Sequence, residues 1–113
     1  MAKRPTPLFR DAEALLRQGI QALDYERLEE AAALLIQATQ LAPESADAFL
    51  ALGITLTRLL RIPEAAEALE RAIVLAPENF YPHFRLAQVY LRVGVPTRAR
   101  EELDKAMQLS ETP

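Results

Sequence analysis

The sequence predicts an all-α fold, a right-handed α-α superhelix built from three helix-turn-helix repeats. Apolar residues recur at helical spacing along most of the chain. The pattern itself returns after 34 residues, which over three units indicates stacked repeats. The shared columns are Gly19, Gly53 and Ala87; Ala31, Ala65 and Ala99; Leu35, Leu69 and Leu103; Ala38, Ala72 and Ala106; and Leu41, Leu75 and Leu109.

Six helices are predicted, two in each unit. Their expected ranges are 8–24, 27–41, 46–60, 63–75, 80–93 and 96–109. Pro63 suits the first turn of the fourth helix, where its missing N–H costs nothing. Pro43 and Pro77 close the first two units, and Ser45 or Asn79 is expected to cap the helix that follows.

The domain organisation follows from the period. Residues 1–7 are expected to form a flexible lead, and residues 8–113 a single domain with repeats at about 12–45, 46–79 and 80–113. The glycine column suggests a close crossing of the two helices in each repeat, with the Ala31, Ala65 and Ala99 column facing it. The last helix is more polar than the earlier ones, so it is expected to cap the stack, and Met107 and Leu109 remain apolar on it. This favours a complete three-repeat protein, although a domain of a longer chain is the alternative.

The composition excludes several classes of function. A net charge of −3 and a pI near 5.2 argue against a nucleic-acid-binding protein, which normally presents a basic face. The chain has no cysteine, so it offers neither disulfides nor thiolate sites. No segment resembles a signal peptide or reaches the roughly 20 apolar residues of a membrane span. We therefore expect a cytoplasmic protein without membrane insertion.

The same columns resemble the tetratricopeptide repeat family, whose pattern is W-x₂-L-G-x₂-Y…A-x₃-F…P over 34 residues. The middle unit matches with Phe49, Leu52, Gly53, Leu56, Ala65, Leu69 and Pro77. The first unit departs from the pattern at Gln18, where Leu is expected, and the third at Glu111, where Pro is expected. The resemblance covers residues 12–113. It implies that the first helix of each unit lines a concave groove for a peptide or helix of a partner, and it brings no catalytic residues.

A second stripe on the first helices is left over from packing within the repeats. Each set has the spacing of one helix face, so each forms a line along its helix. By resemblance these residues face the groove: Leu16, Ile20 and Leu23; Leu50, Ile54 and Thr57; and Tyr81, Phe84, Gln88 and Leu91. The functional interpretation is a hydrophobic binding surface. The alternative is additional packing between helices, with Leu8 and Phe9 folded over the groove.

Charged residues lie beside this stripe. Asp24, Arg58 and Arg92 share a column, and Arg85 lies near it. The arginines are candidates to pair with an acidic group on a ligand. The alternatives are solvated surface charge or a local pair with Asp24.

One binding mode of the family is disfavoured. Members that clamp an acidic chaperone C-terminus use Lys and Asn on the first groove helix and Lys and Arg on the third. Here those positions are Leu16 and Ile20, then Tyr81 and Arg85, so only the arginine is retained. The groove therefore favours apolar side chains, such as one face of an amphipathic helix.

No catalytic centre is predicted. His83 is the single histidine and occupies the aromatic packing column of Phe49, so a structural role is expected. Acidic pairs such as Glu29-Glu30 and Glu101-Glu102 are interpreted as solvated charge. No metal or cofactor site is predicted, and the chain is not expected to be an enzyme.

The predicted function is protein binding, as an adaptor or small chaperone. Two alternatives remain open. One is a self-associating scaffold that forms homo-oligomers through the groove or the last helix. The other, by analogy with small bacterial relatives, is a component of a secretion, pilus or envelope assembly.

Overall fold

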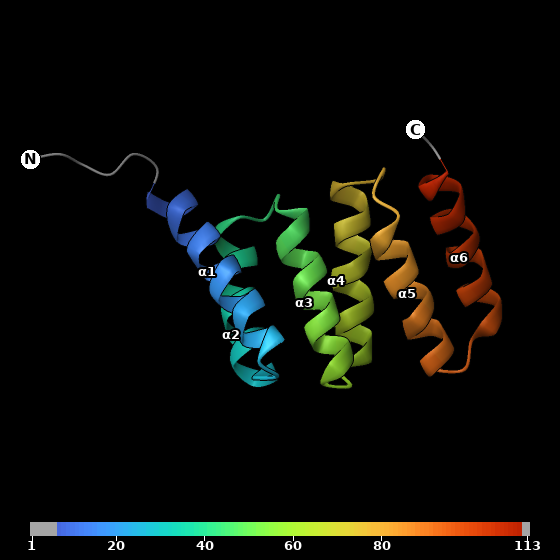
Figure 1. Ribbon diagram of the computed structural model, residues 1–113, viewed down its shortest axis with the longest axis horizontal. Helices are drawn as coiled ribbons and strands as arrows, with labels where there is room; N and C mark the ends of the chain where they lie inside the picture. The colour runs from blue at the N-terminus through green and yellow to red at the C-terminus, as the bar shows by residue number, and fades with distance from the viewer. Residues whose placement is uncertain (1–6, 112–113) are drawn as a thin grey trace, which may run out of the picture.

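The computed structural model describes residues 7–111, with side chains from residue 11 onward. Within this range the chain forms six helices and no strand (Figure 1). They are α1 (Pro7–Asp24), α2 (Leu28–Leu41), α3 (Ala46–Arg58), α4 (Ile62–Leu75), α5 (Tyr81–Arg92) and α6 (Pro96–Ser110). The molecule is an elongated slab of 58 × 33 × 20 Å. The expected flexible lead lies almost entirely outside the described residues, apart from Pro7, which begins α1.

The helices pack as three antiparallel hairpins placed side by side. The pairs α1–α2, α3–α4 and α5–α6 form the repeats, and α2–α3 and α4–α5 contacts join them. The first helices also touch one another, α1 with α3 and α3 with α5. The predicted bounds agree to within one residue except at the end of α3, which stops at Arg58 instead of residue 60.

In all three hairpin turns a residue in the left-handed conformation ends the first helix. Glu26, Leu60 and Gly94, at equivalent positions, adopt the left-handed conformation with φ of 61°, 62° and 78°. After α3, the Leu60 N–H donates to the Thr57 carbonyl and the Arg61 N–H to the Leu56 carbonyl. These two bonds form a Schellman motif, and the same pair follows α1 and α5. The left-handed residue explains why α3 is shorter than predicted.

The expected cap at Ser45 and the first-turn position of Pro63 are confirmed, whereas the N-cap of α5 is Phe80, one residue after Asn79. The Ser45 hydroxyl accepts a hydrogen bond from the Ala48 N–H at 3.2 Å, which caps α3. The Asn79 side chain accepts one from the Tyr81 N–H at 3.1 Å, at the start of α5. Pro63 is the second residue of α4, where no backbone donor is needed.

The close crossing is present in the first two hairpins, and the residue nearest to each glycine is a leucine that was not predicted. A Cβ placed on Gly53 would lie 2.7 Å from the Leu69 side chain, and one on Gly19 would lie 2.6 Å from that of Leu35. Ala65 also faces Gly53, as predicted, with its carbonyl oxygen 3.4 Å from that Cβ position. The glycines are needed because a fully buried leucine fills the space that a side chain would take.

Candidate functional site

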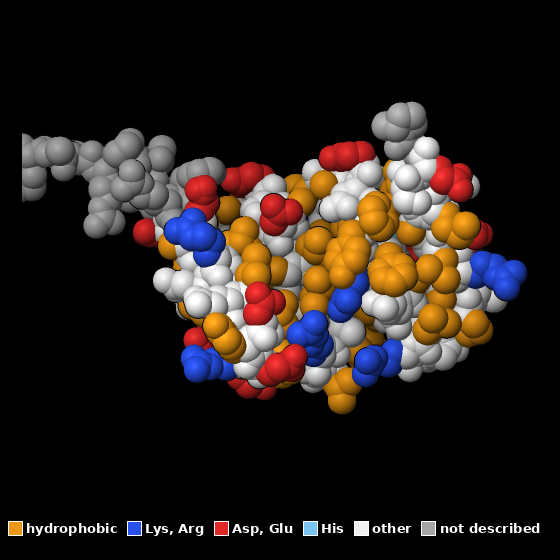
Figure 2. Space-filling view, viewed as in Figure 1, with side chains coloured by type: hydrophobic (Ala, Val, Ile, Leu, Met, Phe, Trp, Pro, Cys, Tyr) orange, Lys and Arg blue, Asp and Glu red, His pale blue; other side chains and the backbone are white. Residues whose placement is uncertain are grey.

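The predicted site residues lie on α1, α3 and α5, and we call the surface that these helices form the first-helix face. Figure 2 shows hydrophobic side chains gathered over the middle of the molecule, above α3 and α5. Exposed apolar side chains on these helices are Ile20 (40% exposed), Phe84 (38%) and Leu91 (56%). Leu16, Leu50, Ile54 and Tyr81 are half-buried.

Two of the predicted stripes meet in one hollow between α1 and α3. Its volume is about 280 Å³, and its lining is almost entirely apolar. The lining residues are Leu16, Ile20, Leu23, Asp47, Leu50, Ala51 and Ile54. The 34-residue spacing therefore brings together five of the predicted residues from two helices.

Two of the predicted groove residues are almost fully buried, so they offer little surface to a partner. Leu23 lines the hollow, but it is only 7% exposed and belongs to the core around Leu35 and Leu52. Thr57 is 8% exposed, and its hydroxyl donates to the Gly53 carbonyl at 2.8 Å. Both residues lie near the end of their helix. The spacing along one helix assigned them to the groove, but it does not show which neighbouring elements bury them.

The third stripe forms a separate aromatic cluster on α5. The rings of Tyr81 and Phe84 stack with their centroids 6.1 Å apart. Phe80, just before α5, packs edge-on against Tyr81 at 6.3 Å and is 43% exposed. Phe80 was absent from the predicted site, although three aromatics within five positions were a signal for it. Such rings offer large contact area to a partner at low entropic cost.

The three predicted arginines have different surroundings. Arg58 lies 3.5 Å from Glu26, and not beside Asp24 as the alternative proposed. Arg85 lies over the Tyr81 ring, 5.9 Å from its centroid. Arg92 is exposed and has no partner among the described residues. Gln88, on the same helix, is also exposed. The face thus offers single cations and no clustered clamp.

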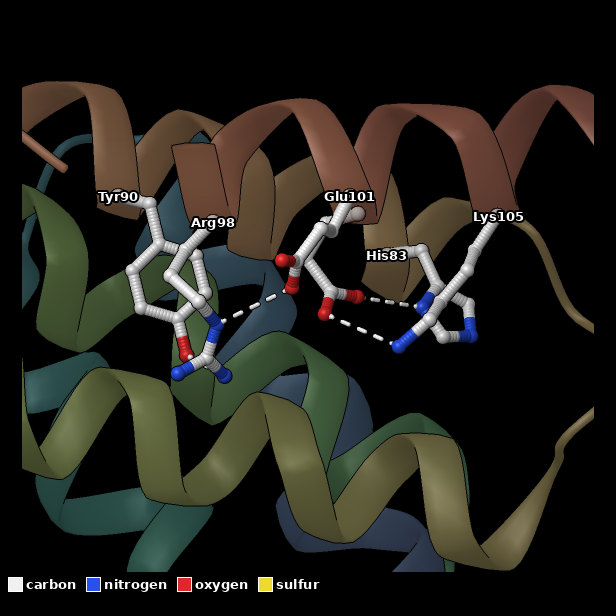
Figure 3. A network of polar contacts seen from close by, with 6 residues as sticks. His83, Tyr90, Arg98, Glu101 and Lys105 are labelled. Atoms are coloured by element: carbon white, nitrogen blue, oxygen red, sulfur yellow. Dashed lines mark hydrogen bonds and ion pairs between the residues drawn. The ribbon is translucent and has the colours of Figure 1, made fainter. Parts of the chain in front are cut away.

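The interpretation of Glu102 as solvated charge was wrong. Glu102 is 4% exposed, and its carboxylate lies 2.7 Å from the Nδ1 of the buried His83. Figure 3 shows His83 and Lys105 approaching one acidic side chain, which is that of Glu102; Lys105 is 3.5 Å away. The structural role expected for His83 agrees with this pairing. In the middle repeat, the positions equivalent to His83 and Glu102 are Phe49 and Ala68. Both columns therefore change from apolar to polar together in the third repeat, and this change in the sequence could have indicated that the two residues pair.

Other site chemistry is not found within residues 11–111. No group of three metal-ligating side chains gathers there. None of the described helices is both long enough and apolar enough to cross a bilayer.

The sequence comparison identifies the family. A tetratricopeptide repeat family model matches residues 16–80 and again residues 56–111. The chain belongs to the tetratricopeptide repeat family. No curated protein matches the sequence. The predicted family and the all-α repeat fold are therefore confirmed.

Solved tetratricopeptide repeat proteins share the fold. The structure titled "MamA MSR-1 C2" superposes with a TM-score of 0.84 at 24% identity, over 88% of this chain and 57% of that one. The TPR2B domain of yeast Sti1 in complex with pHsp70 gives 0.86 at 24%, over 88% and 80%. The Yersinia enterocolitica type III secretion translocator chaperone SycD gives 0.86 at 20%, over 90% and 78%. This chain spans less than two thirds of the MamA chain, and at these identities the likeness establishes the fold alone.

Proposed function

We propose that this protein is a non-catalytic binding module that holds an apolar or amphipathic segment of a partner protein on its first-helix face. The observation that carries the proposal is the apolar hollow between α1 and α3, together with the separate exposed aromatic cluster that α5 adds to the same face. An exposed apolar surface of this kind, rimmed by polar residues, is typical of interaction sites.

The shape of the surface favours one face of an amphipathic helix. Ile20 and Ile54 from neighbouring repeats meet in the hollow, which suits side chains that repeat every three or four residues. Arg58 on α3 and Arg92 on α5 are the residues of this face that would contact acidic groups of the partner segment. The similar fold of Sti1 TPR2B, whose structure is titled as a complex with pHsp70, supports a protein partner.

The proposal is tested by comparative capture from an extract of the native source. The baits are the natural protein, an Ile54→Glu/Phe84→Glu variant and a Val74→Glu control. Val74 is 67% exposed on α4 and lines a different hollow, between α2, α3 and α4, so the control adds one charge to an exposed apolar site outside the hollow between α1 and α3. A partner should be retained by the natural protein and the control and lost by the double variant. Identical capture by all three baits would show that the first-helix face does not bind the partner.

A self-associating scaffold is the second candidate function. Met107, 59% exposed on α6, is the observation that favours it, because it leaves an apolar side chain at the end of the stack. Sedimentation of the purified protein distinguishes the two functions, since a monomer at high concentration contradicts the scaffold. We place the protein in the cytoplasm as part of the same proposal, and fractionation of cells tests that location.

A further inference from the structure

The hollow between α2, α3 and α4 is larger than the one between α1 and α3. Its volume is about 510 Å³, compared with about 280 Å³. The helical period places Leu52 and Leu56 on the opposite side of α3 from Ile54, so the two hollows are separate surfaces. We call the larger one the α2–α4 hollow. Its floor is apolar and consists of Phe49, Leu52, Leu56 and Ala68.

In the third repeat, the chain's own side chains occupy the equivalent place. Arg98 lies over the Tyr90 ring, 4.8 Å from its centroid, and donates a hydrogen bond to the Tyr90 hydroxyl at 3.0 Å. Glu102 is buried against His83, with 2.7 Å between its carboxylate and Nδ1. Figure 3 shows both contacts together with Lys105, which lies 3.5 Å from Glu102. The polar side chains of the third repeat therefore find their partners within the chain.

In the middle repeat, the corresponding residues leave this place open. Ala68 stands at the position of Glu102, and the first repeat has Leu34 there. The smallest of the three residues therefore lies in the floor of the α2–α4 hollow. Glu64 stands at the position of the arginine that covers the third repeat, but it pairs with Arg61 on the rim, 2.6 Å away.

Val74 is the least expected residue of the rim. Its side chain is 67% exposed on α4, and the equivalent residues of the other two repeats are Gln40 and Gln108. Valine has a lower helix propensity than glutamine, and an exposed valine adds nothing to the core. An apolar side chain at this position therefore benefits neither the helix nor the packing. Beside an apolar hollow, such a side chain is typical of a binding site.

The rim carries an excess of negative charge. Its charged residues are Arg61, Glu64, Glu67, Glu70 and Arg71. The pair of Arg61 and Glu64 is neutral, and Arg71 lies over the Phe49 ring, 6.0 Å from its centroid. Glu67 and Glu70 have no ion-pair partner among the described residues. 

The adjoining helix adds to this excess. The first turn of α2 contains Glu29 and Glu30, its last turn contains no basic residue, and Arg27 precedes it. Together with the rim, five carboxylates stand against three guanidinium groups. The α2–α4 hollow is therefore complementary to a cationic ligand with an apolar group.

We propose that the α2–α4 hollow binds an apolar side chain of a basic segment in a partner protein. The apolar side chain contacts Phe49 and Val74, and Lys or Arg residues beside it contact Glu67 and Glu70. The negative rim disfavours an acidic segment. Because this hollow lies on the opposite side of α3 from Ile54, the proposal does not depend on binding at the first-helix face.

Selection from a displayed library of random peptides tests the proposal, with the natural protein as bait. The selected peptides are then synthesised, and their Kd values are measured for variants of the hollow. Val74→Gln introduces the residue of the other two repeats at an exposed helical position, so it should not disturb the fold. Glu67→Gln/Glu70→Gln removes charge from the rim and keeps the size of the side chains. Ile54→Glu/Phe84→Glu is the control, because it changes only the first-helix face.

The expected result is a group of peptides that carry Lys or Arg beside a large apolar residue. Val74→Gln should raise their Kd about five-fold, since it removes an apolar contact at the edge of the site. Glu67→Gln/Glu70→Gln should raise the Kd at least as much, and added salt should weaken binding to the natural protein. The control should leave the Kd unchanged. If no peptide responds to both variants of the hollow, or if the responding peptides lack Lys and Arg, the proposal is overturned.

The same measurements separate this proposal from the proposed function. Peptides that lose binding only in Ile54→Glu/Phe84→Glu belong to the first-helix face, so either proposal can fail alone. Other occupants of the hollow give different results. An oligomer in sedimentation velocity that Val74→Gln dissociates would assign the hollow to a second copy of the chain. Kd values lowered by Lys3→Ala/Arg4→Ala would assign it to the chain's own N-terminal residues, and either result would overturn the proposal.

Discussion

His83 and Glu102 form the buried polar contact that distinguishes the third repeat from the second. Their side chains lie between α5 and α6, where the second repeat has Phe49 and Ala68 in the same columns. A buried hydrogen-bonded pair adds little net stability, but removing one partner leaves the other unsatisfied. Loss of one member of the pair should therefore change the stability more than the intact pair contributes to it.

We predict that Glu102→Ala lowers the free energy of unfolding by about 1–3 kcal/mol, because His83 Nδ1 loses its buried partner. His83→Phe/Glu102→Ala, which reproduces the residues of the second repeat, should be less destabilised than Glu102→Ala alone. Urea denaturation of the natural protein, the two single variants His83→Phe and Glu102→Ala, and the double variant measures this difference. A double variant that loses as much as the sum of the two single changes would contradict the explanation.

Gly53 gives a second prediction at the residue scale. Gly53→Ala gains about 1 kcal/mol of helix propensity but forces a methyl group against the fully buried Leu69, so we expect a net loss of about 1 kcal/mol. Thermal melting measures it. Adding Leu69→Val should restore part of the loss in a double-mutant cycle, whereas purely additive effects would show that the two residues do not compete for space.

At the element scale, the sequence predicted the helices well and the surface less well. The apolar period and the prolines fix the helices because both act locally. Burial of Leu23 and Thr57 depends on how the neighbouring helix crosses, which a single helix face does not contain. Glu102 was misassigned for the same reason, since its partner lies 19 residues away on another helix.

The hairpin turns yield a prediction about helix ends. Leu60 occupies the left-handed position after α3 that Gly94 occupies after α5. Leu60→Gly should therefore raise the free energy of unfolding by up to about 1 kcal/mol, since glycine has no Cβ to strain. Chemical denaturation measures the change. Gly94→Leu is the reciprocal control and should destabilise; equal stability of both variants and the natural protein would show that the turn is not strained.

At the scale of the whole molecule, the 34-residue period places different functions on different surfaces. One side of α1, α3 and α5 packs within the repeats, while Ile20, Ile54 and Phe84 remain on the first-helix face. The sequence alone predicted both the 34-residue period and the second apolar stripe on the first helices. The joining of α1 and α3 into one hollow, with α5 as a separate aromatic cluster, required the structure.

The central claim is that the first-helix face binds a partner segment, and calorimetric titration of a captured partner's segment tests it most directly. We predict that Ile54→Glu/Phe84→Glu raises the Kd at least about 10-fold, because two charges replace apolar contacts in the binding surface. Val74→Glu should leave the Kd unchanged, and circular dichroism should show the same helix content in all three proteins. An unchanged Kd in the double variant would contradict the account.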